Sequence, residues 1–370
     1  MHTHVRACSK ARLCRRIYAG VMAIVVVAGC GPADVGLRAS AQEYRPSNEL
    51  TRTESTAVAG DDIGLVRDFD IGGDSIYLLD AAGRVIIAAR EGAAIRVVGH
   101  FGRRGDGPGE LARPTGLALA GGDIVVADGT RLQFFSRDGE FLSTKRLSPP
   151  CPMMLPKVAS ARVGVFVHGG CLRRGYTTDT MKAVLAWSRD TAKWEVIVET
   201  PRFTTDGSLG SVFGPASLLA TGVGGTHAFG GGERNCIWRI EDGGDRPIAN
   251  EICPAVSTLY RADPPPGLEA RMRSARFAGM NLSWPASLPA YGDSFVTGNE
   301  IVLLRAFTAD SLVLQLAGPS ALDIAVAPHD GLLGCKAGGC VWLLDETATP
   351  RMIVLDRTKL EAMIHRTSRK

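Results

Sequence analysis

Long apolar segments with helical periodicity are scarce in this chain of 370 residues. The 44 glycines and 20 prolines instead indicate many turns. Hydrophobic residues make up 45% of the chain, so it can bury a sizeable core, and its length suits either two domains or one large all-β domain. The sequence therefore favours an all-β fold.

Motifs of nucleotide-binding and serine-hydrolase sites are missing as well. The glycine-rich stretch 101–111 has no Lys-Ser or Lys-Thr pair of a phosphate-binding loop, and an alternating strand pattern follows Pro114 where such a loop needs a helix. We interpret this stretch as a tight connector between two sheets. No Gly-x-Ser-x-Gly nucleophile elbow occurs either.

The chain beyond residue 29 has almost no net charge. Five of the 42 Lys and Arg residues lie within positions 1–29, where no Asp or Glu occurs, which leaves 37 basic residues against 38 acidic ones. Nucleic-acid binding therefore has no basic surface to rest on, and we expect no nucleic-acid partner.

The first thirty residues have the order of an export signal. A basic leader precedes the apolar run Ile17–Ala28, which is shorter than a membrane-spanning helix. The run ends in Val27-Ala28-Gly29-Cys30, which resembles the lipobox of bacterial lipoproteins. The resemblance implies a lipoprotein signal peptide over residues 1–29 and a lipid on Cys30. A plain secretory signal or an uncleaved anchor helix is the alternative, and either one also implies export.

Residues 30–55 are polar and irregular, which suits a flexible tether. Gly31 follows the cysteine, whereas in lipoproteins of enteric bacteria an Asp at this place favours the inner membrane. The lipoprotein resemblance therefore implies a lipid-anchored protein of the cell envelope. Its expected place is the outer membrane, facing the periplasm or the cell surface.

Six cysteines remain after Cys30, and an exported chain meets an oxidising compartment, so disulfides are expected. Of the possible pairings we favour those between nearest neighbours in the sequence. A zinc site is the alternative, but it needs short paired spacings and only the last pair is close. The expected disulfides are Cys151–Cys171, Cys236–Cys253 and Cys335–Cys340.

Two stretches of the chain repeat each other: Gly72–Asp80 matches Gly121–Asp128 with one residue deleted. The Asp that ends each copy is interpreted as a residue that fixes the turn after the strand. Weaker copies extend the pattern to six units between residues 56 and 357, a period typical of a β-propeller with four-stranded blades. They place the second strands of later units at 163–167, 236–240, 300–304 and 338–345.

The stretch Phe101–Leu142 resembles the NHL-type repeat of bacterial six-bladed β-propeller proteins. The shared features are the Gly-x-Gly-Pro-Gly-Glu connector, the Pro before the inner strand, a strand that ends in Val-Ala-Asp and the turn Ser136–Gly139. Pro289-Ala290-Tyr291 resembles the late blades of such proteins. The resemblance implies one all-β domain, a six-bladed propeller over residues 56–357.

The ends of this domain and one insertion can be placed as well. Residues 53–59 are expected to complete the last blade beside 351–355, and residues 358–370 form a C-terminal tail. A short helical insertion is expected over Gly267–Met280, because apolar residues recur on one helical face after three prolines.

Candidate metal ligands are few. Metal-dependent lactonases and hydrolases of propeller architecture hold a cation in the central channel with Glu, Asn and Asp from inner strands. The matching residues here are Asp68 and Asp70, near the inner strand of the first blade, and Asp323, near that of the sixth. Calcium or another divalent cation is the metal they would suit, although we expect no cofactor.

Candidate ligand-binding residues are two histidines and two aromatic residues. His168 and His227 lie beside glycines or turns, where a histidine is most often a solvated surface residue. Trp284 and Tyr291 could form an exposed binding patch, and core packing is the alternative for both.

We therefore expect a non-enzymatic binding or scaffold module for a protein, a peptide or a glycan at the cell envelope. The alternative is a metal-dependent hydrolase, lactonase or lyase that acts in the central channel of the propeller. Convergent metal ligands at one mouth of the ring favour the enzyme, and an exposed apolar or aromatic patch favours the binding module.

Overall fold

In the computed structural model, all described residues belong to one compact unit, which spans Pro46–Lys370. No helix among these described residues is long and apolar enough to cross a membrane. The described residues are 56–59, 63–92, 94–149, 151, 153–171, 182–201, 218–222, 225–230, 236–253, 293–297, 300–306, 311–317, 322–328, 331–344 and 350–367.

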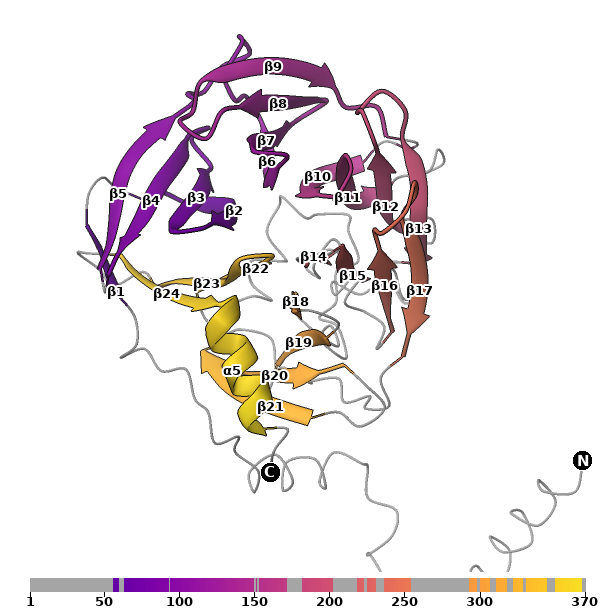
Figure 1. Cartoon of the computed structure of the whole chain (residues 1–370). Helices are drawn as coiled ribbons and strands as arrows, with labels where there is room; N and C mark the ends of the chain where they lie inside the picture. Colours follow the sequence, from indigo (N-terminus) through magenta and orange to yellow (C-terminus); the bar gives the residue numbers. More distant parts are fainter. Residues whose placement is uncertain are drawn as a thin grey trace, which may run out of the picture. The chain divides into compact units, whose positions relative to one another are not determined.

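The described strands form six groups of four that follow one another around a ring (Figure 1). Within each group, neighbouring strands pair antiparallel. Four of the groups are separate sheets, and the first and last groups join into one eight-stranded sheet through a parallel pair, β1 with β5. This strand order is that of a β-propeller, so the all-β propeller class is confirmed; the number of blades in the complete ring stays a prediction.

The innermost strands are β2 (Val66–Gly72), β6 (Pro114–Ala120), β10 (Met153–Ser160), β14 (Leu218–Thr221), β18 (Asp293–Thr297) and β22 (Leu332–Lys336). The second strands are β3 (Ser75–Asp80), β7 (Asp123–Asp128), β11 (Val165–Cys171), β15 (Thr226–Gly230), β19 (Glu300–Ala306) and β23 (Gly339–Leu344). The third strands are β4 (Val85–Glu91), β8 (Arg131–Phe135), β12 (Lys182–Ser188), β16 (Ile237–Glu241), β20 (Ser311–Leu316) and β24 (Arg351–Asp356). The outermost strands are β5 (Ala94–Phe101), β9 (Phe141–Arg146), β13 (Glu195–Pro201), β17 (Ile248–Ile252), β21 (Leu322–Pro328) and β1 (Thr56–Ala59).

The core lies between neighbouring groups of strands. The second strand β7 reads Asp-Ile-Val-Val-Ala-Asp and is buried on both faces, because a sheet packs against each side of its own. One core cluster joins Tyr77 and Leu79 of the first group to Leu117 and Ile124 of the second. The outer strand β9 reads Phe-Leu-Ser-Thr-Lys-Arg and is mostly exposed. In this second group the apolar content therefore falls from the second strand to the outermost.

The strand β1 closes the ring. It pairs antiparallel with β24, where Thr56 is opposite Met352, and parallel with β5, where Val58 is opposite Ile95. The N-terminal end of the described chain thus supplies the fourth strand of the last group. This confirms the predicted pairing for residues 56–59, the part of 53–59 that the structure describes.

The C-terminal residues form the helix α5 (Arg357–Thr367), which begins at the last residue of the predicted propeller and continues into the expected tail 358–370. The Asp356 carboxylate accepts a hydrogen bond from the backbone N–H of Lys359 at 2.8 Å and caps the helix. Leu360, Met363 and Ile364 are buried in the core cluster of the last two groups, so this segment belongs to the folded domain. The helix expected over 267–280 lies outside the described residues.

The three expected disulfides are present: Cys151–Cys171, Cys236–Cys253 and Cys335–Cys340. Each joins neighbouring strands of one sheet or the residues next to them, as the nearest-neighbour pairing predicts. Cys335 and Cys340 lie directly opposite each other in the β22–β23 hairpin.

The repeated aspartates have the expected structural role. Asp80 is fully buried and accepts hydrogen bonds from the backbone N–H and the Nε of Arg84, each at 2.8 Å. Asp128 accepts the Nε of Arg131 at 2.9 Å and the backbone N–H of Arg113 at 2.5 Å. Each carboxylate fixes the turn that follows its strand, and the matching Asp345 lies outside the described residues.

The fourth group corrects one prediction. Residues 236–240 were expected to be a second strand, but β16 is the third strand of its sheet, and β15 takes the second position. The reason is that β15 reads Thr-His-Ala-Phe-Gly and lacks the branched aliphatic residues that mark second strands such as β3, β7 and β19.

Candidate functional site

Two aspartates of the inner strand β2 join it to the inner strand of the next group. Asp68 and Asp70 are two residues apart, so they point to the same face of the strand. The Asp68 carboxylate accepts the backbone N–H of Phe69 at 3.0 Å and that of Leu117 in β6 at 2.9 Å. The Asp70 carboxylate accepts the N–H of Ile71 at 2.8 Å and that of Leu119 in β6 at 2.9 Å. The pair therefore forms a two-rung connection between neighbouring inner strands.

Two lysines from other inner strands approach Asp68. The Nζ of Lys336 in β22 lies 3.3 Å from one carboxylate oxygen, and the Nζ of Lys157 in β10 lies 3.8 Å from it. Burial alone would raise the pKa of Asp68, but Lys157 and Lys336, together with the two backbone amides, hold that pKa below its ordinary value. Asp68 is therefore a buried carboxylate with two cationic partners.

The pKa of Asp70 is shifted in the opposite direction to that of Asp68. Burial raises the pKa of Asp70 to about 6, with a smaller contribution of the same sign from Asp68, against the lowering effect of Lys336 and the two amides. The strand thus presents one carboxylate that is ionised at neutral pH and one that takes up a proton in mildly acidic solution.

The predicted metal ligands do not fit a cation in the channel. The Lys336 ammonium already lies against Asp68, in the place that a cation would take, and the oxygens of Asp70 accept backbone amides. Asp323 lies in β21, the outermost strand of the fifth group, where it pairs with Gln315 of β20. The prediction that it lies near the inner strand of the sixth group is wrong, because β22 takes that position. The structure therefore does not place Asp323 with Asp68 and Asp70.

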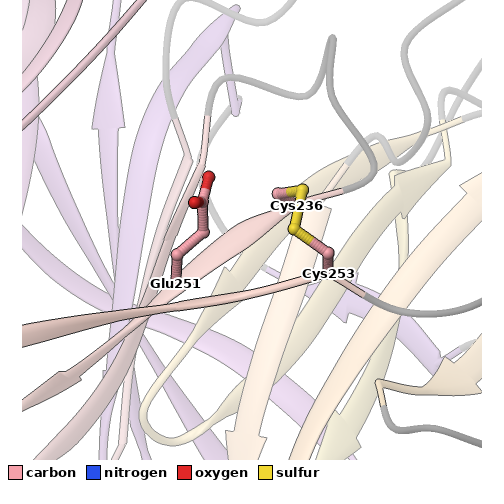
Figure 2. Close-up of side chains that lie close together, drawn as sticks. All are labelled: Cys236, Glu251 and Cys253. Atoms are coloured by element: carbon pink, nitrogen blue, oxygen red, sulfur yellow. A yellow bond between two sulfur atoms is a disulfide. The ribbon is translucent and has the colours of Figure 1, made fainter.

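A second candidate metal centre comprises Cys236, Glu251 and Cys253 in the fourth group. The ligand atoms of these residues lie within 4.8 Å of one another. Figure 2 shows, however, that the two sulfur atoms are bonded to each other. Thiolate ligation requires free, deprotonated sulfur, so this cluster is a disulfide with a carboxylate beside it.

His168 is buried among the channel charges and does not lie at the surface. Burial lowers the pKa of His168 to about 3, with further lowering by Lys336 and Lys157 and an opposing effect of Asp68. The imidazole is therefore neutral in the folded protein at neutral pH. The expectation of a solvated histidine is wrong here, because β11 is covered on both faces.

A cavity of about 420 Å³ opens at the ends of the inner strands. The last residues of β2, β6, β10 and β14 contribute to it, together with the turn between β22 and β23. Apolar side chains form part of the wall, and polar side chains converge on it from three strand groups. The lining residues are Asp70, Ile71, Leu119, Ser160, Ala161, Arg162, Thr221, Gly222, Gly225, His227 and Ala337.

His227 is the buried polar side chain of this cavity. It is 3% exposed, its ring packs edge-on against Phe166 at 5.1 Å, and its Nε2 lies 3.8 Å from an oxygen of Asp242. Among the described residues, neither ring nitrogen of His227 has a hydrogen-bond partner. The Asp242 oxygen accepts the backbone N–H of Arg162. Both nitrogens are also buried from solvent, so their hydrogen-bonding capacity is unused inside the protein and not turned toward the open part of the cavity.

The sequence indicated some of these residues and missed others. Asp70 and His227 were candidates, whereas Lys336, Lys157 and Asp242 were not, since only strand register shows that they point inward. Trp284 and Tyr291 lie outside the described residues, as do Cys30 and the whole signal segment.

No family model matches the sequence, and no curated protein matches it. Three solved structures resemble the fold. PorZ, a surface component of the type-IX secretion system of Porphyromonas gingivalis, has a TM-score of 0.38 and 11% identity over 70% of this chain and 26% of that chain. U3-55K has a TM-score of 0.46 and 10% identity over 83% and 99% of the two chains. The β-propeller domain of Cps50 from Myceliophteria thermophila has a TM-score of 0.37 and 12% identity over 80% and 98%.

The chain thus spans about a quarter of the PorZ chain. The assignment of this protein to the β-propellers rests on its own strand order, with six groups of four strands among the described residues.

Proposed function

We propose that this protein is a lipid-anchored, six-bladed β-propeller, similar to NHL-repeat proteins, that binds a protein, peptide or glycan at the cell envelope without catalysing a reaction. The lipid is carried by Cys30, residues 30–55 are the tether, and the propeller faces the periplasm or the cell surface from the outer membrane. The order of basic leader, apolar run and lipobox supports this location. Three disulfides suit an oxidising compartment.

The observation that carries the binding function is the cavity at the ends of the inner strands. Its volume of about 420 Å³ is in the usual range of small-ligand sites, and such sites combine apolar walls with a few convergent polar groups. Two of the inner strands that form the walls, β2 and β6, are fixed to each other by Asp68 and Asp70, so this part of the site is formed before a ligand arrives.

The hydrolase alternative is less well supported. Its metal needs convergent carboxylates with free lone pairs, whereas Asp68 is engaged by Lys336 and both aspartates accept backbone amides. We therefore assign no cofactor. Metal analysis of the intact chain, purified without chelator, is expected to give clearly less than one metal per chain. Near-stoichiometric calcium with a raised Tm would favour the hydrolase.

Site-specific photocrosslinking in the native envelope tests the binding function. Ala337 lies at the cavity in the β22–β23 turn, and a photoreactive residue placed there is expected to form an adduct of defined mass. Ala82, an exposed residue in the β3–β4 turn, is the matched control and is expected to give none. The same adducts from both positions, or none from Ala337, would contradict binding at this site.

Fractionation of the Cys30→Ser variant tests the anchor. The unmodified chain is expected in the membrane fraction, and the variant is expected to be absent from it, because lipid attachment to Cys30 is lost. Retention of the variant in the membrane to the same extent would favour an uncleaved anchor helix.

A further inference from the structure

One of the three described disulfides is accessible at the surface. Cys253 is exposed and Cys236 is half-buried, whereas Cys335 and Cys340 are 3% and 0% exposed. The Cys151–Cys171 bridge has no exposed member either. A disulfide is opened when a thiolate attacks one of its sulfur atoms, so an exposed bridge is reduced more readily than a buried one. We therefore expect Cys236–Cys253 to be the first bridge that a reductant opens.

The strands that carry these two cysteines stay paired without the bridge. β16 and β17 pair antiparallel through five residue pairs, the last of which is Ile237 opposite Ile252, and β16 pairs with β15 on its other side. Cys236 directly precedes β16 and Cys253 directly follows β17, so the bridge closes the open end of a hairpin that is already hydrogen-bonded. Reduction therefore frees the two sulfur atoms and leaves them close together.

A carboxylate lies on the same face of the hairpin as the bridge. Glu251 precedes Cys253 by two residues, and side chains two apart along an extended chain point to the same side. The ligand atoms of Cys236, Glu251 and Cys253 lie within 4.8 Å of one another, and Figure 2 shows the carboxylate beside the two sulfur atoms. Glu251 is exposed, and no residue in the described part of the chain forms an ion pair with it. Its oxygens are therefore available to a cation.

Two thiolates and one carboxylate are a ligand set for zinc. Zinc in proteins is bound by Cys, His, Asp and Glu in a tetrahedral arrangement, and a site with three protein ligands keeps the fourth position for water. Calcium and magnesium take oxygen ligands, so thiolates select against them. Only the reduced pair offers thiolates, because the sulfur atoms of a disulfide are bonded to each other and carry no charge. Zinc binding is thus tied to the redox state of Cys236 and Cys253.

We propose that Cys236, Glu251 and Cys253 form a redox-controlled zinc site, which goes beyond the proposed binding function and uses no residue of the cavity. The reductant is a dithiol, as in a thiol–disulfide oxidoreductase. One of its thiolates attacks a sulfur of the bridge, and its second thiol resolves the mixed disulfide, so the reductant is oxidised to a disulfide and the bridge is reduced to two thiols. Both thiols then release their protons to solvent as zinc binds.

Zinc titration of the intact chain in detergent, before and after mild reduction, tests the proposal. Graded dithiothreitol, alkylation and peptide mass mapping identify the concentration that opens only the bridge between Cys236 and Cys253. After removal of the reductant without oxygen, we expect about one zinc per chain, and none for the oxidised chain. Cobalt in place of zinc should give a thiolate-to-cobalt charge-transfer absorption. Opening of another bridge first, or no zinc on the reduced chain, would overturn the proposal.

Variants of the same hairpin locate the zinc. Glu251→Gln leaves the bridge and the strand pairing in place, so folding is not at risk. Loss of a group that merely supports a metal ligand costs roughly tenfold or more in affinity, and this variant loses a ligand itself, so we expect zinc to bind at least tenfold more weakly. Glu241→Gln, an exposed position at the other end of the hairpin, is the matched control and should bind zinc as the reduced unmodified chain does. Equal affinities of the two variants would overturn the three-ligand site.

Discussion

At the scale of single residues, buried charges hold neighbouring inner strands together. Asp68 in β2 contacts Lys336 of β22 on one side and the backbone of β6 on the other, so one carboxylate spans three strand groups. Such a pair adds little by its mere presence, because desolvation offsets the attraction, but removal of Lys336 leaves the buried Asp68 with only the more distant and more exposed Lys157 as a cationic partner.

Lys336→Met is therefore expected to destabilise the protein by about 3–5 kcal/mol in denaturant unfolding at neutral pH. The loss should shrink as the pH falls and Asp68 becomes protonated, because Lys336 is one of the groups that lower the pKa of Asp68. Lys193→Met, at an exposed position, is the control and should lie within about 0.5 kcal/mol of the unmodified chain. A loss of equal size at both positions would contradict this role of Lys336.

His168 should make the protein sensitive to acid. Its pKa is about 3 in the folded protein and ordinarily about 6.5, so between these values the unfolded chain binds a proton that the folded chain does not. The contribution of His168 to the free energy of unfolding is therefore at its full value above pH 6.5, and it falls by about 1.4 kcal/mol for each pH unit below 6.5. The measurement is the difference in unfolding free energy between the protein and His168→Gln from pH 7 to pH 4.

Asp70 changes the pH dependence of folding stability in the opposite direction. The effect of His168 must therefore be measured as the difference between the unmodified chain and His168→Gln, because both proteins contain Asp70. The pKa of Asp70 is about 6 in the folded protein and ordinarily 3.8, so its contribution to stability grows as the pH falls from 6 to 4. A pH-independent difference for His168→Gln would contradict the burial of a neutral imidazole.

At the scale of elements, the approach of neighbouring inner strands depends on a glycine. A Cβ at Gly116 in β6 would lie 2.7 Å from the Cα of Lys157 and 2.8 Å from the backbone N of Val158 in β10. Both obstacles are backbone atoms, which can give way only if the strands move apart. The glycine therefore sets the distance between the second and third groups.

Gly116→Ala is accordingly expected to cost about 1–3 kcal/mol through overpacking, measured by urea unfolding. Gly99→Ala in the outer strand β5 is the matched control, because no atom lies within 4 Å of the added Cβ. It should be neutral or slightly stabilising, since alanine restricts the unfolded chain more than glycine does. Equal losses in the two variants would show that strand propensity, and not the inter-strand distance, decides the effect.

The elements that could be predicted from the sequence are those with a complete local pattern. The glycine turn and terminal Asp of β3 recur in β7, so both strands and their turns were found. β15 lacks that pattern, and its buried face is supplied by other groups, which local sequence does not reveal. The candidate site shows the same limit. The sequence identifies Asp70 as a candidate carboxylate ligand, but the residues that surround it depend on how the strands of three groups are aligned with one another.

At the scale of the whole molecule, closure of the ring depends on the four residues of β1, which are far in sequence from β22, β23 and β24, the other strands of their group. In β1, Val58 is 4% exposed, its N–H donates to the carbonyl oxygen of Pro350 at 2.9 Å, and its side chain joins the core cluster of Ile95 and Met352. The next residue, Ala59, is exposed. One strand thus presents a core position and a solvent position side by side.

Val58→Asp should open this junction, because an unpaired charge cannot be accommodated among the apolar side chains of the first and last groups. We expect a loss of about 3 kcal/mol or more and a clearly lower Tm in calorimetry. Ala59→Asp places the same charge one residue further on, toward solvent, and should leave Tm almost unchanged. Limited proteolysis of Val58→Asp should cut first near the β1–β24 junction. Equal Tm values for the two variants would mean that the propeller remains closed without the β1 core contact, and that the other inter-group contacts suffice.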